Sequence, residues 1–450
     1  MLGQDMKFAD EHNNVAIQTT TAALPLESMV AAQPGVVEFS DRPRATSIAY
    51  DHEARPSCFS NTVAEVAFVL IATFSIGQYA ILEGLLMTTS SRIQIGLDMD
   101  AAEVTWLLAG PALTSGAFLV FFGRVADLFG RRKLLILSMA VYSILILITG
   151  FSTSAVMIET VLALVGISCA SVVPPAIGKL GAIYERPSRR KNAAFACFSA
   201  GNPVGFVVGA FLGGIITQIS SWRTTFWAIA VFYGLLTIVA WFVTPLDAEQ
   251  RLGGFNRQTF AQMDWLGAFL VIAGIALFTA AFTIGPEARQ QWGTPHIIVM
   301  LVIGVLSMSA FVYWQSKFEA PLMPLYVWKD KNFSLLVLSL CLGYYGFVEN
   351  FLWMCLGWQR TYGDSPLTVA VKTLPGALGG IIMNVIAAML MHRVSNKLLF
   401  MIAAAANVAA SVLLSVSSKS ISYWALAFPW QLLAVTGGDI SFCVTSVVSE

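Results

Sequence analysis

We single out two of the carboxyl side chains that stand inside long apolar runs of this sequence. Glu83 lies in the run 63–88, together with Gln78, and Glu349 lies in the run 333–358. Ionisable groups within membrane-spanning segments are costly, and they usually line a cavity or meet a partner. A carboxyl in an apolar cavity can exchange a proton near neutral pH. We therefore predict that these three residues act in a cavity and in proton coupling. Snorkelling to the interface, or a bond between helices, is the alternative for the two carboxyls.

A charged motif follows the second apolar run and reads GRVADLFGRRK over residues 123–133. A glycine at the end of a helix can take the left-handed conformation that stops it. Two opposite charges four residues apart meet on one helix face. A basic anchor with a helix stop would explain the arginines, but not the glycines and the aspartate at these positions. We predict a gating loop formed by Gly123, Arg124, Asp127, Gly130, Arg131 and Arg132.

Small residues recur every four positions in the fifth apolar run. Such spacing places them on one side of a helix, where a neighbouring backbone can approach closely. The run also holds a proline, which removes a backbone hydrogen bond and can kink the helix. Ordinary small-residue packing would explain the glycines alone. The candidate residues are Gly201, Pro203, Gly205, Gly209, Gly213 and Gly214.

Several other kinds of chemistry find no support in the sequence. The six cysteines form no C-x-x-C pair, so a metal or disulfide framework is not predicted. No G-x-x-x-x-G-K-[ST] phosphate loop occurs, which disfavours a primary pump. The formal net charge of zero gives no basic field for nucleic acid. We predict no enzyme activity, no cofactor and no nucleic-acid partner.

Apolar runs dominate the chain and must position these candidates. Of 450 residues, 57% are hydrophobic and 12% are charged, against about half and about a quarter in soluble domains. A spanning helix needs about 20 mainly apolar residues. Twelve runs meet this requirement: 63–88, 105–126, 133–152, 156–180, 193–218, 223–243, 265–284, 296–314, 333–358, 366–390, 398–416 and 421–448. Their length and continuity exclude a β-barrel, so the sequence predicts an all-α membrane protein.

Basic residues gather in every second connection between these runs, beginning with Arg131, Arg132 and Lys133. Loops rich in Lys and Arg stay on the cytoplasmic side, which predicts that both termini are cytoplasmic. The polar composition of residues 1–60 predicts a disordered tail. We divide the rest into an amino-terminal six-helix bundle (61–244), a linker with two inserted helices (245–332) and a carboxyl-terminal bundle (333–450).

The 123–133 motif resembles the loop signature of the major facilitator superfamily, G-x-x-x-D-x-x-G-R-[RK]. The glycine-rich run with Pro203 resembles the antiporter signature of drug:proton exporters in that superfamily. The segment from Pro321 to Phe333 resembles the connector of fourteen-span members, in which two extra helices separate two six-helix halves. The resemblance covers roughly residues 60–450 and is closest to fungal exporters of the aminotriazole-resistance type. The segment 391–397 would then be a degenerate second copy of the loop motif.

This resemblance implies a major facilitator fold with a fourteen-span layout whose last two helices are lacking, so that the carboxyl-terminal bundle is incomplete. In such relatives the loop aspartate, here Asp127, caps a helix of the opposite half, and that helix would be missing. The rival interpretation is a twelve-span protein whose carboxyl half starts at residue 265. It would put the second motif copy in the 315–332 connection, which has no such pattern.

Two departures bear on mechanism. Family exporters usually carry Arg and Gln in the fourth helix, where this sequence has Leu162 and Val165, and many have an Asp in the first helix, which is absent here. We predict a monomeric secondary transporter of the plasma membrane that exports small organic or toxic compounds against proton entry, with protons and lipid as its other partners. The alternatives are a proton-independent uniporter or importer, and a membrane sensor that transports nothing.

Overall fold

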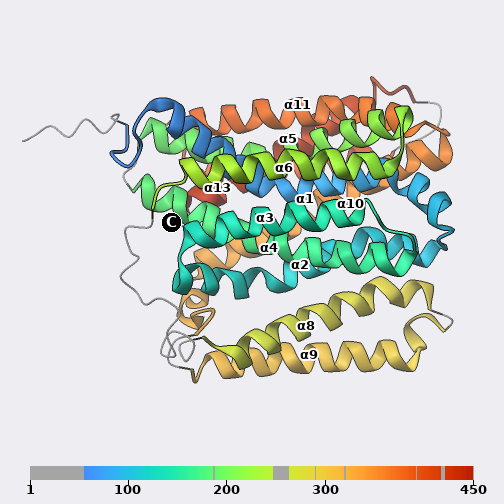
Figure 1. Cartoon of the computed structure of the whole chain (residues 1–450), viewed down its shortest axis with the longest axis horizontal. Helices are drawn as coiled ribbons and strands as arrows, with labels where there is room; N and C mark the ends of the chain where they lie inside the picture. Colours follow the sequence, from blue (N-terminus) through green and yellow to red (C-terminus); the bar gives the residue numbers. More distant parts are fainter. Residues whose placement is uncertain are drawn as a thin grey trace, which may run out of the picture. The chain divides into compact units, whose positions relative to one another are not determined.

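The computed structural model describes residues 55–185, 188–246, 263–288, 290–318, 321–391, 393–416 and 421–448. Within these ranges all regular secondary structure is helical (Figure 1). The first six long helices are α1 (Thr62–Leu97), α2 (Ala101–Phe129), α3 (Arg131–Thr149), α4 (Ala155–Ile183), α5 (Arg189–Ile219) and α6 (Trp222–Val243). The others are α8 (Trp265–Ile284), α9 (Pro295–Gln315), α10 (Lys331–Thr361), α11 (Pro366–Leu390), α12 (Asn396–Ser415) and α13 (Ala427–Val448).

Each of the twelve predicted apolar runs corresponds to one of these helices. Eleven helices in the described part of the chain are long and apolar enough to cross a membrane, and α13 is a further helix of 22 residues. The helix α1 continues nine residues past the end of its predicted run. The residues that follow the apolar stretch, Arg92 among them, are helical as well. Most of the predicted amino-terminal tail lies outside the described residues.

Local sequence signals begin several of these helices. The side chain of Asp100 accepts a hydrogen bond from the Glu103 amide, and the Glu103 carboxylate accepts one from the Asp100 amide. This reciprocal capping box satisfies two amides that have no partner inside the helix. Ser154, Ser188 and Ser221 cap α4, α5 and α6 in the simpler way, through one side-chain oxygen each.

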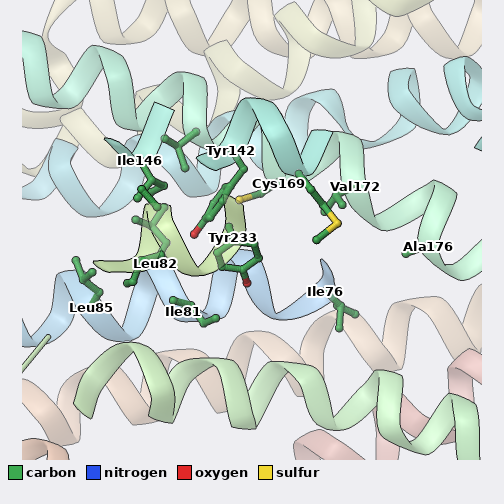
Figure 2. Packing of buried hydrophobic residues seen from close by; sticks show 14 of the residues in the cluster. Ile76, Ile81, Leu82, Leu85, Tyr142, Ile146, Cys169, Val172, Ala176 and Tyr233 are labelled. Atoms are coloured by element: carbon green, nitrogen blue, oxygen red, sulfur yellow. The ribbon is translucent and has the colours of Figure 1, made fainter. Parts of the chain in front are cut away.

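The core of the amino-terminal half is built around α1, which packs against α4, α5 and α6. Figure 2 shows Tyr142 of α3 and Tyr233 of α6 among the buried aliphatic side chains of this core. Their ring centroids lie 4.6 Å apart. The Tyr142 hydroxyl donates to the Gln78 carbonyl at 3.0 Å, and the Tyr233 hydroxyl to the Phe74 carbonyl at 2.9 Å. The buried phenols are thereby satisfied, and they fix α1 against its neighbours.

The helices α8 and α9 form a hairpin that packs chiefly against α2 (Figure 1). Asp264 closes the base of this hairpin, because its carboxylate accepts hydrogen bonds from the Trp314 indole at 2.8 Å and the Gln315 amide at 2.6 Å. In the carboxyl-terminal half, α10, α11 and α12 each contact α13. This arrangement agrees with two inserted helices, but the division of the chain into bundles stays a prediction.

Candidate functional site

Five helices enclose a cavity of about 100 Å³ where the two halves meet. The helices α1 and α5 supply one side, and α10, α11 and α13 supply the other. A single water needs about 10–15 Å³ of such space, so the cavity holds several waters or a small solute. Its polar lining consists of Tyr79, Glu83, Asn202, Tyr344, Thr373 and Asp439, and much of the remainder is phenylalanine.

Glu83 is one of the predicted candidates, and the structure places it on the wall of this cavity. The adjacent residue fixes its position. A Cβ atom added at Gly84 would lie 2.1 Å from the Phe206 carbonyl oxygen of α5, so α1 and α5 touch through their backbones directly beside the carboxyl. The Glu83 side chain therefore points into the cavity from the most closely packed part of the amino-terminal half.

A second carboxyl, Asp439, enters the same cavity from α13 and was missed in the sequence analysis. A Cβ atom at Gly380 would lie 2.6 Å from Asp439 Oδ2 and 2.9 Å from Pro203 Cβ, so these three residues meet at one point. Tyr344 of α10 lines the same cavity as Glu83 and Asp439. The rule that selected Glu83, an acidic residue inside an apolar run, would also have found Asp439 in the run 421–448.

The other two coupling candidates are placed differently. Gln78 is fully buried in the core of the amino-terminal half and is not among the residues that line the cavity. Its side-chain amide makes no hydrogen bond to the described part of the chain. Glu349 belongs to α10, but its side chain lies outside what the structure describes. A role in coupling for either residue stays a prediction.

The glycine-rich run of α5 packs directly on α1. Added Cβ atoms at Gly201, Gly205, Gly209 and Gly213 would lie 2.0–2.7 Å from atoms of α1, and the first three would meet backbone carbonyl oxygens. The four-residue spacing therefore produces the predicted close approach of backbones. Gly214 faces elsewhere, since its added Cβ would meet Leu367 of α11 at an ordinary 3.6 Å. The role of these residues as an antiporter motif stays a prediction.

The predicted gating loop joins α2 to α3 through Gly130 alone. Its φ of 98° favours glycine, as predicted, but its ψ of 133° lies outside the left-handed helical region, so the chain turns at once into the next helix. Arg131 pairs with Asp127 at 3.2 Å and donates to the Gly178 carbonyl of α4 at 2.8 Å. Arg132 donates to the Trp241 carbonyl of α6 at 2.7 Å.

These contacts bind the loop to its own half of the protein. Arg131 and Arg132 together hold the ends of α4 and α6 against the start of α3, while the Asp127 side chain stays 55% exposed. An added Cβ atom at Gly123 would meet nothing within 4 Å. A gating role for Gly123 and Arg124 stays a prediction.

Leu162 and Val165, the positions where family exporters usually carry polar residues, are fully buried in the apolar core of the amino-terminal half. Neither lines the cavity. The acidic side chains of the cavity wall are Glu83 and Asp439.

Comparison with known proteins agrees with this architecture. The sequence matches the description of the Major Facilitator Superfamily over residues 66–449, and the chain belongs to this family. It is 26% identical to the low affinity ammonium transporter of Saccharomyces cerevisiae, with 78% of this chain and 67% of that protein covered. It is 26% identical to the efflux pump terJ of Aspergillus terreus (88% and 75% covered) and 25% identical to the aminotriazole resistance protein of Saccharomyces cerevisiae (76% and 63% covered).

The protein is therefore an integral, multi-pass transporter with the major facilitator fold, and it resembles the drug-resistance members. The predicted resemblance to the aminotriazole-resistance type is confirmed. Transporters of this family take small molecules as substrates.

Proposed function

We propose that this protein exports small organic compounds in exchange for protons, and that Glu83 and Asp439 carry the protons. The observation that carries the proposal is the meeting of two carboxyls in one cavity, one from each half of the protein. A site shared by both halves is the place at which rocking of the halves changes access from one side of the membrane to the other.

The surroundings of the two carboxyls support this role. Neither Glu83 nor Asp439 forms an ion pair within the described residues. An uncompensated carboxylate in a low-dielectric cavity costs several kcal/mol, so a proton or a basic solute compensates the charge. Exchange of one for the other at the same carboxyl links export of a solute to entry of a proton.

The orientation of the protein in the membrane follows from the position of the basic residues. Arg131, Arg132 and Arg190 lie at the same end of the amino-terminal helices, where they bond to the ends of α4 and α6 and to the start of α1. Basic ends of spans stay in the cytoplasm. We infer that this end and both termini are cytoplasmic and that the protein works in the plasma membrane as a monomer. Outward release of solutes is proposed from the efflux and resistance relatives.

A proton-independent uniporter is the second candidate, and one observation favours it. Leu162 replaces a polar position of the exporters and is fully buried among apolar side chains, so the amino-terminal half lacks one means of proton coupling that its relatives have. A sensor that transports nothing has no comparable support.

Transport in sealed vesicles tests the proposal. Purified wild-type protein, Glu83→Gln, Asp439→Asn and Glu349→Gln are reconstituted, and flux of labelled aminotriazole and methylammonium is measured with and without a pH gradient. We expect Glu83→Gln and Asp439→Asn to lose at least nine-tenths of the solute-driven proton flux. The control is Glu103→Gln, since Glu103 caps α2 far from the cavity and Gln serves equally well in a capping box.

Full proton-coupled transport by both Glu83→Gln and Asp439→Asn would show that the carboxyls are not the carriers. Equal solute flux with and without the gradient in the wild type would favour the uniporter.

A further inference from the structure

The helix α11 carries a proline at the wall of the central cavity. Pro375 lies inside the helix, and its neighbours Thr373, Gly376 and Ala377 line the cavity. Proline has no N–H, so the Val371 carbonyl four residues earlier loses its helical partner, and the ring pushes against that carbonyl. This turn of α11 is therefore the weakest point of its hydrogen-bond ladder.

The side-chain amide of Gln431, from α13, bonds to this turn at two points. Gln431 Oε1 accepts from the Gly376 amide at 2.9 Å, and Gln431 Nε2 donates to the Lys372 carbonyl at 2.9 Å. In an uninterrupted helix the amide of residue 376 would bond to the carbonyl of residue 372. One side chain thus bonds to both the amide and the carbonyl that would form a single backbone hydrogen bond of the helix. Side chains inserted in this way are a known cause of helix kinks.

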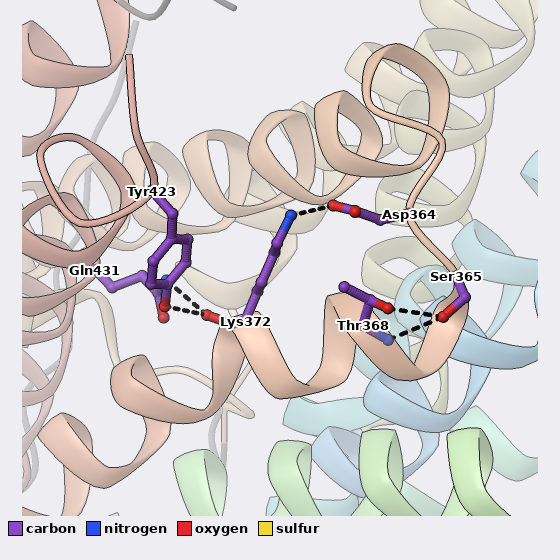
Figure 3. Close-up of polar contacts among 6 residues, drawn as sticks. All are labelled: Asp364, Ser365, Thr368, Lys372, Tyr423 and Gln431. Carbon is purple, nitrogen blue, oxygen red and sulfur yellow. Dashed lines mark hydrogen bonds and ion pairs between the residues drawn. The ribbon is translucent and has the colours of Figure 1, made fainter. Parts of the chain in front are cut away.

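The surroundings are fitted to the amide. Gln431 is 1% exposed. An added Cβ atom at Gly376 would lie 2.9 Å from Gln431 Oε1, so only glycine leaves room for it. The Tyr423 hydroxyl donates to the Lys372 carbonyl at 2.7 Å and accepts from Gln431 Nε2 at 3.3 Å (Figure 3). Burial raises the pKa of Tyr423, which keeps this hydroxyl protonated and able to donate.

The turn of α11 to which Gln431 bonds separates two cavities, and Gln431 is called the clamp below. The central cavity lies on the side of Thr373 and Gly376. A second cavity of about 430 Å³ lies toward the Pro366 end of α11 and is lined by Lys372 and Tyr423 together with aromatic side chains of α10. The Lys372 ammonium pairs with Asp364 in the loop before α11 (Figure 3). Trp430, next to the clamp in sequence, is fully buried and stacks near Phe351, with the ring centroids 6.1 Å apart.

We propose that Gln431 is a positioning residue that prepares α11 to bend at Pro375, so that the segment 366–374 between the two cavities moves relative to 376–390 during transport. In a membrane, backbone groups exposed by a bend need partners inside the protein. The amide supplies both partners, so α11 can bend here without leaving unsatisfied groups. The inference depends on transport by movement of the helices and is independent of proton coupling.

A comparison of a single and a double variant distinguishes a role of Gln431 in the movement of α11 from a purely structural role. Gln431→Leu removes the clamp and leaves Pro375 in place, so the freed backbone groups destabilise the fold. Gln431→Leu combined with Pro375→Ala allows an uninterrupted helix, in which residues 375 and 376 bond to the carbonyls of 371 and 372. The control is Thr436→Val, because Thr436 lies on the same helix and its hydroxyl bonds only to its own helix at Leu432.

Three measurements are made on full-length protein in vesicles or detergent: the midpoint of heat unfolding, counterflow of labelled aminotriazole, and the alkylation rate of Thr373→Cys by an impermeant maleimide, resolved by peptide mass spectrometry. Counterflow needs no proton gradient, and alkylation needs no substrate, so failure of proton coupling leaves both readouts intact. We expect Gln431→Leu to unfold at lower temperature than the wild type. We expect the double variant to regain the wild-type midpoint of heat unfolding. We expect its rate of alkylation at Thr373→Cys and its rate of counterflow each to be at least tenfold lower than in the wild type.

A double variant with wild-type rates of alkylation would show that Gln431 only satisfies buried polar groups, and the proposal would be overturned. The same follows if Gln431→Leu alone matches the wild type, or if the double variant unfolds as early as the single one.

Discussion

Replacing Gly209 by alanine gives a sharp test of how α1 and α5 are joined. The added Cβ atom would lie 2.0 Å from the Ile81 carbonyl oxygen and 2.9 Å from Ile81 Cα, whereas ordinary contact begins at 3.4 Å. Both neighbours are backbone atoms within long helices, so no side chain can turn aside. The two helices must separate by roughly 1 Å at this point, because a close-packed interior cannot absorb the overlap elsewhere.

The cost of this separation is about 1–3 kcal/mol, the range found for overpacked cores. The separation disturbs the line of close contacts between α5 and α1 that continues through Gly201, Gly205 and Gly213. It also displaces the stretch of α1 that carries Glu83. Since 1–3 kcal/mol corresponds to about 5–150-fold in an equilibrium, we expect transport in vesicles to fall by at least fivefold. Gly209→Leu should abolish transport, with membrane insertion unchanged.

The chain offers a matched control on the same scale. Gly116→Ala meets nothing within 4 Å, so this variant should transport at the wild-type rate and unfold at the wild-type temperature. If Gly209→Ala is as active and as heat-stable as Gly116→Ala, the backbone contact between α1 and α5 does not determine activity and the reasoning is refuted.

Three further predictions concern the ends of the helices. Gly130→Ala forces a φ of 98° on a residue with a Cβ atom, and circular dichroism on heating should show a loss of about 1–3 kcal/mol. Glu65→Gln replaces the 2.7 Å ion pair with Arg190 by a neutral contact; charge-assisted bonds are worth about 1.5–3 kcal/mol, and the midpoint of heat unfolding should fall. Asp264→Ala removes the acceptor that closes the α8–α9 hairpin and should lower heat stability, while counterflow of labelled aminotriazole stays within twofold of wild type because the hairpin packs outside the cavity.

The helices of this protein could be predicted from the sequence because a membrane sets a single length requirement for each span. Every predicted run became a helix, and the ends moved by at most four residues except at the end of α1 and at the start of α13, which begins at Ala427 instead of residue 421. At the end of α1 the polar continuation to Leu97 stays helical, which a rule based on hydropathy cannot detect. The close approach of α5 to a neighbour was also predictable, since it follows from glycine spacing alone, but the identity of that neighbour as α1 was not.

The site was only partly predictable. Glu83 was found because a charge inside an apolar run is exceptional, and Asp439 was overlooked although it obeys the same rule. Gln78 was chosen as a polar residue of the same apolar run as Glu83, but residues five apart on a helix point in different directions. The structure accordingly buries Gln78 in the core rather than at the cavity wall. The role of Gln431 could not be predicted, since a glutamine acquires it only when α13 lies against Pro375.

The two walls of the cavity differ in their mechanical character. On one side, α1 and α5 interlock through glycines and carbonyl oxygens, which leaves no room for sliding. On the other, α13 presents Gln431, Val435 and Asp439 at intervals of four residues, which is one stripe of a helix. Gln431 and Asp439 reach the backbone of α11 at Gly376 and Gly380, themselves four residues apart. The carboxyl proposed to exchange a proton and the amide that bonds to the turn at Pro375 therefore act on the same helix within about 12 Å of each other. If Asp439 exchanges a proton as proposed, its protonation changes the attraction between α13 and α11 at Gly380, a little over one turn from Pro375.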